Sequence, residues 1–120
     1  GHTTSHPALA TLPTDEVENE ILDNKVFLET TIQTSVDHFA YPFGGALSCG
    51  DREADIVAGT GFRSAVTTRM GGLFPAHLDM QYSLPRVGIS AHDTRATIFN
   101  KISGVHQFVR TRGGSPVVAM

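Results

Sequence analysis

Short segments with the pattern of β-strands alternate with segments that have the pattern of helices along this chain of 120 residues. The expected strands are residues 36–41, 62–67 and 84–89, and the expected helices begin near residues 14, 51 and 93. Alternation of this kind is typical of a parallel sheet whose strands are joined by crossover helices. The order of elements therefore favours an α/β fold with a parallel sheet over a β-sandwich.

Several residues mark the expected ends of these elements. Thr14 is expected to cap the first helix with its hydroxyl, and Gly61 to follow the second helix in a left-handed conformation. Asp93 is expected to cap a last helix that ends at Gly113-Gly114. Residues 117–120 are expected to form either a further strand or a frayed tail.

Composition and charge limit the class of protein. Hydrophobic residues make up 40% and charged residues 18% of the chain, which indicates a globular protein of one domain at most. The net charge of −3 gives no basic surface for nucleic acid, so a nucleic-acid partner is not expected. Apolar runs are all shorter than the roughly 20 residues that a membrane span needs. Cys49 is the single cysteine, so an internal disulfide is excluded, and the oligomeric state is left open.

Two histidines stand four residues apart at the start of the chain, His2 and His6, followed by Pro7. Imidazole is the commonest neutral ligand of zinc-like metals, and the small side chains between the two rings let them converge on one ion. The spacing is equally compatible with two solvated loop histidines. Two protein ligands rarely suffice for a metal site, so the pair alone is a weak indication of metal binding.

An aromatic segment with a proline and a glycine follows more than thirty residues later, over residues 39–44. The proline fixes a turn, and the glycine permits close approach of a ligand or of another backbone segment. Aromatic faces suit the C–H faces of sugar rings, which makes a glycan groove one interpretation. A core strand that runs into an ordinary turn is the other.

Taken together and in this order, the two segments resemble the second and third motifs of the polysaccharide deacetylase family, the chitooligosaccharide deacetylases and their relatives in carbohydrate esterase family 4. The resemblance runs from His2 to about Val87. It implies that residues 1–120 are the C-terminal portion of a single domain, part of a distorted (β/α) barrel that is incomplete at its N-terminus. It also implies a hydrolase that removes N-acetyl groups from an N-acetylglucosamine polymer or oligomer, with a divalent metal as cofactor.

The resemblance assigns roles to particular residues. His2 and His6 are expected to hold the metal, which would be zinc, and the N–H of Phe43 is expected to stabilise the oxyanion. The expected substrate-binding residues are Tyr41, Pro42, Phe43 and Gly44. The third metal ligand and the general base belong to a family motif that would precede Gly1, so the chain alone is expected to be inactive or nearly so.

One departure from the family pattern concerns an arginine that orients the catalytic aspartate in many members, because this chain has Ala40 at that position. Arg69 is the candidate replacement, since residues 67–72 are expected to form a loop after the second strand, where α/β barrels carry their chemistry. His77 is the candidate general acid, with His92 as a second possibility. For all three, an exposed residue without a role is the alternative.

Two other interpretations remain open on the sequence alone. The domain could be a non-catalytic glycan-binding or structural remnant that keeps the aromatic groove and has lost the chemistry. The resemblance of such short motifs could also be accidental. Zinc binding that depends on His2 would favour the enzyme, whereas glycan binding without a metal would favour the remnant.

Overall fold

The computed structural model describes residues 1–105 together with residues 109 and 117. The elements in chain order are η1 (Leu9–Thr11), α1 (Thr14–Ile32), β1 (His38–Ala40), α2 (Asp51–Gly59), β2 (Ser64–Met70), η2 (Pro75–Met80), β3 (Leu84–Arg86) and α3 (Arg95–Ile102), where η denotes a 3-10 helix. Strands and helices alternate as expected. The helix end predicted at Gly113-Gly114 and residues 118–120 of the last predicted segment lie outside the described residues.

The three strands form one parallel sheet in the order β1-β2-β3, with β2 in the middle. Phe39 of β1 pairs with Ala65 of β2, and Val66 of β2 pairs with Leu84 of β3. Parallel strands place their carboxyl ends at one edge of the sheet, which is where α/β proteins carry their functional residues. The prediction of a parallel α/β sheet is therefore confirmed.

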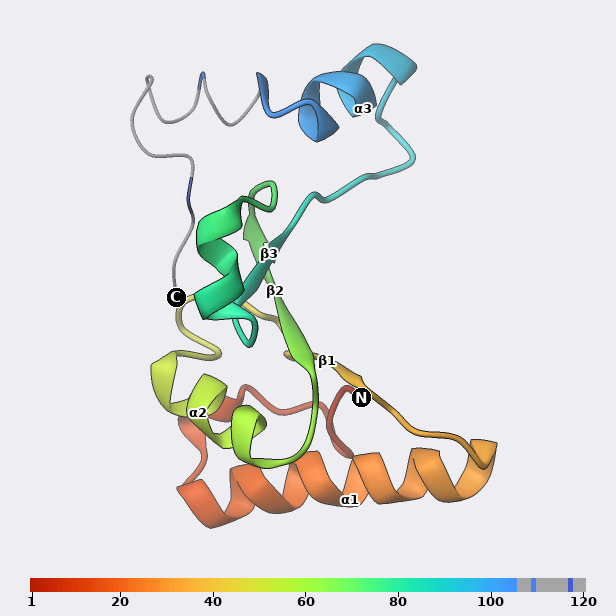
Figure 1. Cartoon of the computed structure of the whole chain (residues 1–120), viewed down its shortest axis with the longest axis vertical. Helices are drawn as coiled ribbons and strands as arrows, with labels where there is room; N and C mark the ends of the chain where they lie inside the picture. Colours follow the sequence, from red (N-terminus) through yellow and green to blue (C-terminus); the bar gives the residue numbers. More distant parts are fainter. Residues whose placement is uncertain (106–108, 110–116, 118–120) are drawn as a thin grey trace.

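The first residue of the chain lies beside the free edge of β1. The amino group of Gly1 donates to the carbonyl of His38 at 2.7 Å, and the N–H of Ala40 donates to the carbonyl of Gly1 at 2.9 Å. This is the hydrogen-bond pattern of a parallel strand partner. It fixes the start of the chain beside β1, where Figure 1 shows the N-terminus, and the ring of His2 reaches the carbonyl of Ala40 at the end of this strand.

The core lies between the sheet and the helices α1 and α2. Figure 1 shows α1 running across one end of the molecule, with α2 beside it and the strands beyond. The buried apolar residues come from both layers and from the segments between them: Leu9, Val17, Ile21, Phe39, Tyr41, Cys49, Val57, Phe62 and Ala65. Burial of each large side chain contributes roughly 1.5–3 kcal/mol, so this cluster supplies most of the driving force for folding.

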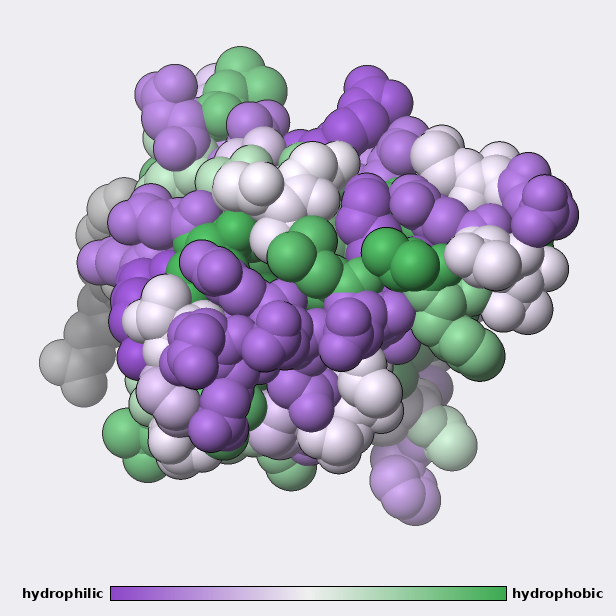
Figure 2. All heavy atoms as spheres, turned by 90° about the horizontal axis from the view of Figure 1, so that it is seen from below, coloured by the Kyte–Doolittle hydropathy of each residue, from purple (hydrophilic) through white to green (hydrophobic). Residues whose placement is uncertain are grey.

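The outer face of α1 is not uniformly polar. Figure 2 shows a row of apolar side chains across that face, with hydrophilic ones on either side. Val26 and Phe27 of α1 are 60% and 65% exposed. None of the described helices is long and apolar enough to cross a membrane.

The second strand extends further than the sequence predicted. Residues 69 and 70 were expected in a loop, but β2 continues to Met70, which pairs with Arg86 of β3. Gly71 N–H also donates to the carbonyl of Arg86 at 3.3 Å. These bonds to β3 keep the backbone extended, so Arg69 projects from a strand rather than from a flexible loop.

Two predicted helix caps are wrong. Pro13, not Thr14, precedes the first turn of α1, and it has no side-chain cap. At α3 the hydroxyl of Thr94, not the carboxylate of Asp93, accepts from the N–H of Thr97 at 3.2 Å. The prediction for Gly61 is confirmed, because it follows α2 with a φ of 77°.

Candidate functional site

The loop of residues 1–7, called the histidine loop below, brings three rings together at the end of β1. The ring centroids of His2 and His6 lie 4.8 Å apart, with the two planes at 70°. The ring of His6 lies 4.9 Å from that of Phe43, again edge to face. Both histidines are exposed. The two sequence motifs, far apart along the chain, therefore meet in one cluster of rings.

The ring of His2 is oriented by the backbone of β1. Its Nδ1 lies 2.6 Å from the carbonyl oxygen of Ala40. Because a carbonyl can only accept, Nδ1 must carry the proton, and the lone pair of the neutral ring is then on Nε2. A hydrogen bond of this kind is the usual way in which proteins fix the tautomer of a metal-binding histidine.

Backbone conformations that are unfavourable for residues with a side chain gather at this cluster. Thr3, His6 and Phe43 have φ values of 63°, 61° and 59°, in the left-handed region. The other such residue in the described part of the chain that is not glycine is Gln33, which ends α1. Conformations of this kind cost about 1–3 kcal/mol each and are common at ligand sites. The surrounding structure must therefore hold this loop in place.

Two polar residues of α1 hold the histidine loop. The carboxylate of Glu20 accepts from the N–H groups of Thr4 and Ser5 at 2.9 and 2.8 Å, and from the hydroxyl of Ser5 at 2.6 Å. Asn24 Oδ1 accepts from the N–H of His2 at 2.9 Å. Burial raises the pKa of Glu20, but the bonds from Ser5 and Thr4 outweigh it, so the pKa lies below its usual value.

Sequence reasoning missed both of these anchors. Glu20 and Asn24 stand one helical turn apart, on the face of α1 next to the loop. Their partners are 15 to 22 positions away in the sequence, and a pattern of polar residues on a helix does not tell which of them contact a loop. The one available signal was the spacing of four between two polar residues.

The turn after β1 is tightly built against β2. The N–H of Gly44 donates to the carbonyl of Pro42 at 2.6 Å, which places Phe43 at the centre of a three-residue turn. Gly44 has a φ of 62°, and its carbonyl accepts from the N–H of Thr68 at 3.0 Å. The ring of Phe43 is 59% exposed, and within the described residues no acceptor is paired with its N–H.

Tyr41 lies inside the protein, which differs from the expectation that its ring lines a groove. It is 1% exposed and belongs to the core, and its hydroxyl donates to the carbonyl of Tyr82 at 2.8 Å. Burial raises the pKa of this hydroxyl far above its usual value. Pro42 is buried as well. Of the four predicted substrate-binding residues, Phe43 is the one whose side chain is exposed.

Arg69 reaches the loop that carries Phe43 from the neighbouring strand. Its Nη2 donates to the carbonyl of Cys49 at 3.0 Å, and its Nη1 is buried with no hydrogen-bond partner among the described residues. A buried guanidinium nitrogen without a partner is unfavourable, so Nη1 suits a carboxylate from outside this part of the chain.

Burial raises the pKa of the Cys49 thiol, which argues against a nucleophilic cysteine.

His77 lies in η2 and is not part of the ring cluster described above. It is 3% exposed, so the alternative of an exposed histidine is wrong. Its Nδ1 accepts from the N–H of Phe74 at 3.0 Å. The structure thus gives His77 a defined ring orientation.

The chain supplies part of a metal site. His2 and His6 have the donor atoms and the proximity that a zinc-like ion requires, and the tautomer of His2 is fixed, so the residues present fit such an ion. No group of three or more His, Cys, Asp or Glu residues is placed to hold a metal in the part of the chain that the structure describes. Catalytic zinc usually has three protein ligands, so two histidines alone make a weak site.

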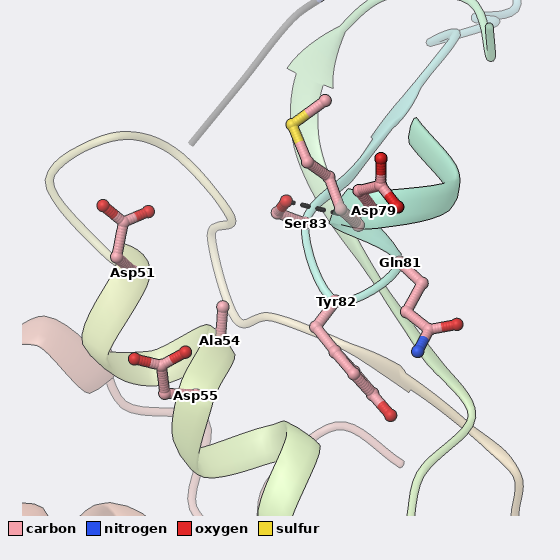
Figure 3. Close-up of a pocket in the computed structure, with 8 residues that line it drawn as sticks. Asp51, Ala54, Asp55, Asp79, Gln81, Tyr82 and Ser83 are labelled. Carbon is pink, nitrogen blue, oxygen red and sulfur yellow. Dashed lines mark hydrogen bonds between the residues drawn. The ribbon is translucent and has the colours of Figure 1, made fainter. Parts of the chain in front are cut away.

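A separate cavity of about 230 Å³ lies between α2 and η2 (Figure 3). Its acidic residues are Asp51 and Asp55 from α2 and Asp79 from η2. In Figure 3 these carboxylates do not point toward one another. Among the described residues they do not form a group that could hold a metal ion. The cavity is therefore not a second candidate metal site.

Comparison with known proteins agrees with the geometry at the end of β1. The model of the family named polysaccharide deacetylase matches residues 1–64, just over half of the chain. The chain belongs to the polysaccharide deacetylase family. The match includes the histidine loop and the turn at Phe43, which confirms the resemblance noted from the sequence.

A solved structure of a deacetylase has a similar fold. It is the Streptococcus pyogenes deacetylase PplD in complex with acetate, with a TM-score of 0.74 and 25% sequence identity. The similarity covers 84% of this chain and 42% of PplD, so the chain spans less than half of that deacetylase. This confirms the prediction of part of a deacetylase-type α/β barrel. No curated protein sequence matches the chain.

Proposed function

We propose that this chain is part of a metal-dependent hydrolase that removes N-acetyl groups from an N-acetylglucosamine-containing glycan. The observation that carries the proposal is the cluster of His2, His6 and Phe43, in which the ring of His6 lies within 4.9 Å of the other two. Membership of the polysaccharide deacetylase family supports the general reaction, hydrolysis of an amide bond. The glycan and the metal are the proposed refinements.

His2 and His6 would hold a divalent cation, for which we propose zinc, since the family is generally metal-dependent. When bound, such an ion supplies Lewis acidity, which lowers the pKa of a water molecule and polarises a carbonyl. The contribution of the chain is to present the unprotonated Nε2 of His2, because Nδ1 is occupied by the Ala40 carbonyl.

Phe43 would act in two ways. Its N–H, which has no acceptor among residues 1–105, would donate to the acetyl oxygen as that oxygen gains negative charge. Its exposed ring would pack on the apolar face of a sugar. Gly44 keeps this turn in place through its hydrogen bond from Thr68.

Arg69 and His77 are proposed for the two remaining roles. The buried Nη1 of Arg69 would donate to a catalytic carboxylate and hold it ionised and correctly oriented, in place of the arginine for which this chain has Ala40. His77, which is buried in η2 and outside the ring cluster, stays the candidate general acid, and this role requires that the substrate reach η2. The general base is not among the groups assembled at the cluster.

Calorimetric titration of the chain with zinc tests the metal site. We expect binding with micromolar affinity that His2→Ala abolishes, while His92→Ala, which changes an exposed histidine, leaves it intact. Binding that survives His2→Ala would contradict the assignment. Chitin oligomers that bind without zinc would favour a non-catalytic glycan-binding domain instead.

Release of acetate from chitin oligomers tests the reaction. Because the described residues do not form a three-ligand site, we expect the zinc-loaded 120-residue chain to release acetate slowly or not at all. Rapid zinc-dependent release, abolished by His6→Ala, would show that the catalytic carboxylate lies within these 120 residues and that its assignment to another segment is wrong.

A further inference from the structure

Side chains of α1 attach the histidine loop to the rest of the protein through several hydrogen bonds. The carboxylate of Glu20 accepts three hydrogen bonds from the loop, and the side chain of Asn24 accepts a fourth. Three of these four bonds come from backbone N–H groups, those of His2, Thr4 and Ser5. Anchors of this kind fix the path of the backbone itself, whatever the loop side chains do.

The backbone conformation that these hydrogen bonds fix is energetically unfavourable. Thr3 and His6 both have left-handed backbones, and each flanks the residues that Glu20 holds. A short segment with two such residues relaxes unless contacts with the rest of the protein prevent it. The hydroxyl of Thr3 accepts from the N–H of His6 at 3.1 Å, but this bond lies within the loop and does not attach it to the rest of the protein.

We propose that Glu20, assisted by Asn24, is a positioning residue that holds the backbone of the histidine loop so that the rings of His2 and His6 face each other. The part that concerns an ion rests on the proposed function. The arrangement of the two rings does not, because it is a property of the chain without metal.

The carboxylate is the group best suited to this task. An ionised carboxylate offers two oxygens, and Glu20 uses both, Oε2 for the two N–H groups and Oε1 for the hydroxyl of Ser5. Hydrogen bonds to an ionised acceptor are roughly twice as strong as neutral ones. A glutamine keeps one acceptor oxygen and adds an N–H₂ group that cannot accept. The substitution Glu20→Gln should therefore preserve part of the effect.

Packing does not replace these bonds. A cavity of about 300 Å³ lies between the loop and α1, lined in part by Thr4, Ser5 and Glu20. If the carboxylate is removed, water fills this space, and no apolar contact with the loop backbone replaces the lost hydrogen bonds. Truncation of Glu20 is therefore expected to release the loop while the core residues of α1, Val17 and Ile21, remain buried.

The first test uses NMR on the metal-free chain. In the wild type, the amides of Thr4 and Ser5 should exchange slowly, and a cross-peak should join the rings of His2 and His6. In Glu20→Ala both amides should exchange at least about tenfold faster and the cross-peak should disappear. The matched control is Glu18→Ala, an exposed glutamate of the same helix, which should behave as the wild type. Unchanged exchange and an unchanged cross-peak in Glu20→Ala would overturn the proposal.

The second test measures zinc affinity by calorimetry. Mutation of a residue that orients a metal ligand typically lowers metal affinity by about 10–100-fold. We expect a loss of that size in Glu20→Ala, a smaller loss in Glu20→Gln and no loss in Glu18→Ala. The melting temperatures of the compared variants must agree, so that a general loss of stability is excluded. If Glu20→Ala unfolds, Glu20→Gln carries the test.

The outcomes separate this inference from the proposed function. If the wild type binds no zinc, the metal assignment fails, and the exchange of Thr4 and Ser5 still decides whether Glu20 positions the loop. If the wild type binds zinc and Glu20→Ala binds it equally well, Glu20 does not position the histidines, although the metal assignment stands.

Discussion

At the scale of single residues, Gly44 meets two constraints that no other residue type satisfies together. Its φ of 62° is unfavourable for a residue with a side chain. A Cβ at this position would also lie 2.6 Å from the backbone nitrogen of Thr68, which cannot move without breaking the pairing of β2. Gly59 is the contrasting case, because a Cβ there would meet nothing within 4 Å.

We therefore expect Gly44→Ala to lower the free energy of unfolding by about 1–3 kcal/mol, measured by urea denaturation. Gly59→Ala at the end of α2 should leave it unchanged or raise it by up to about 1 kcal/mol, since alanine is the better helix former. Equal stability of the two variants would contradict the close contact between the Phe43 turn and β2.

The sequence indicated the residues of the candidate site unevenly, and the reason is the range of their contacts. His2 and His6 stand in a compact motif, so their spacing along the chain is informative by itself. Glu20 contacts the loop from 15 and 16 positions away and Asn24 from 22, where a sequence pattern carries no information about contact. Tyr41 belongs to a motif but points into the core, since the side of a strand that a ring faces depends on register.

At the scale of elements, the positions of the helices and strands followed from periodicity, whereas several boundaries did not. The extension of β2 to Met70 depends on pairing with Arg86, a residue of another strand. The cap of α3 was misplaced by one residue because Asp93 has a different partner, the Nζ of Lys101 at 2.7 Å. Tertiary contacts therefore decided the ends that local preferences left open.

The ion pair of Asp93 predicts a pH dependence of α3. The hydrogen bond from Lys101, followed by that from the N–H of Ser90, lowers the pKa of Asp93 to about 2. A carboxyl whose pKa is depressed by folding stabilises the folded state above its ordinary pKa, near 3.8, and loses this effect as the pH falls towards about 2. Hydrogen exchange of the α3 amides should therefore accelerate as the pH is lowered through this range, after correction for the intrinsic rate.

The control for this prediction is Asp93→Asn, which removes the titrating group and keeps its shape. Its α3 amides should exchange faster than those of the wild type at pH 6, and the difference between the two proteins should shrink as the pH falls towards 2. Asp79→Asn, which changes an exposed carboxyl of η2, should behave as the wild type. A difference between Asp93→Asn and the wild type that stays constant with pH would refute the role of this ion pair.

At the scale of the whole molecule, two tyrosines tie the three strands into one unit. The hydroxyl of Tyr41, directly after β1, donates to the carbonyl of Tyr82, which lies just before β3. The hydroxyl of Tyr82 donates in turn to the carbonyl of Phe62, just before β2, at 3.1 Å. The first bond connects β1 with β3, which do not pair with each other, and the second adds to the pairing of β2 with β3. Loss of the first bond should therefore destabilise the whole sheet.

We expect Tyr41→Phe to lower the free energy of unfolding by about 1–3 kcal/mol, because the buried carbonyl of Tyr82 loses its donor while the ring keeps its packing. Urea denaturation followed by tyrosine fluorescence and by circular dichroism should give coincident transitions, as expected if the sheet unfolds as one unit. Tyr82→Phe is the companion variant and should be less costly, since the ring of Tyr82 is only partly buried. Zinc affinity should be unchanged in both, because neither hydroxyl contacts the histidine loop. A Tyr41→Phe variant of wild-type stability that binds chitin oligomers more weakly would instead assign this tyrosine to the sugar groove.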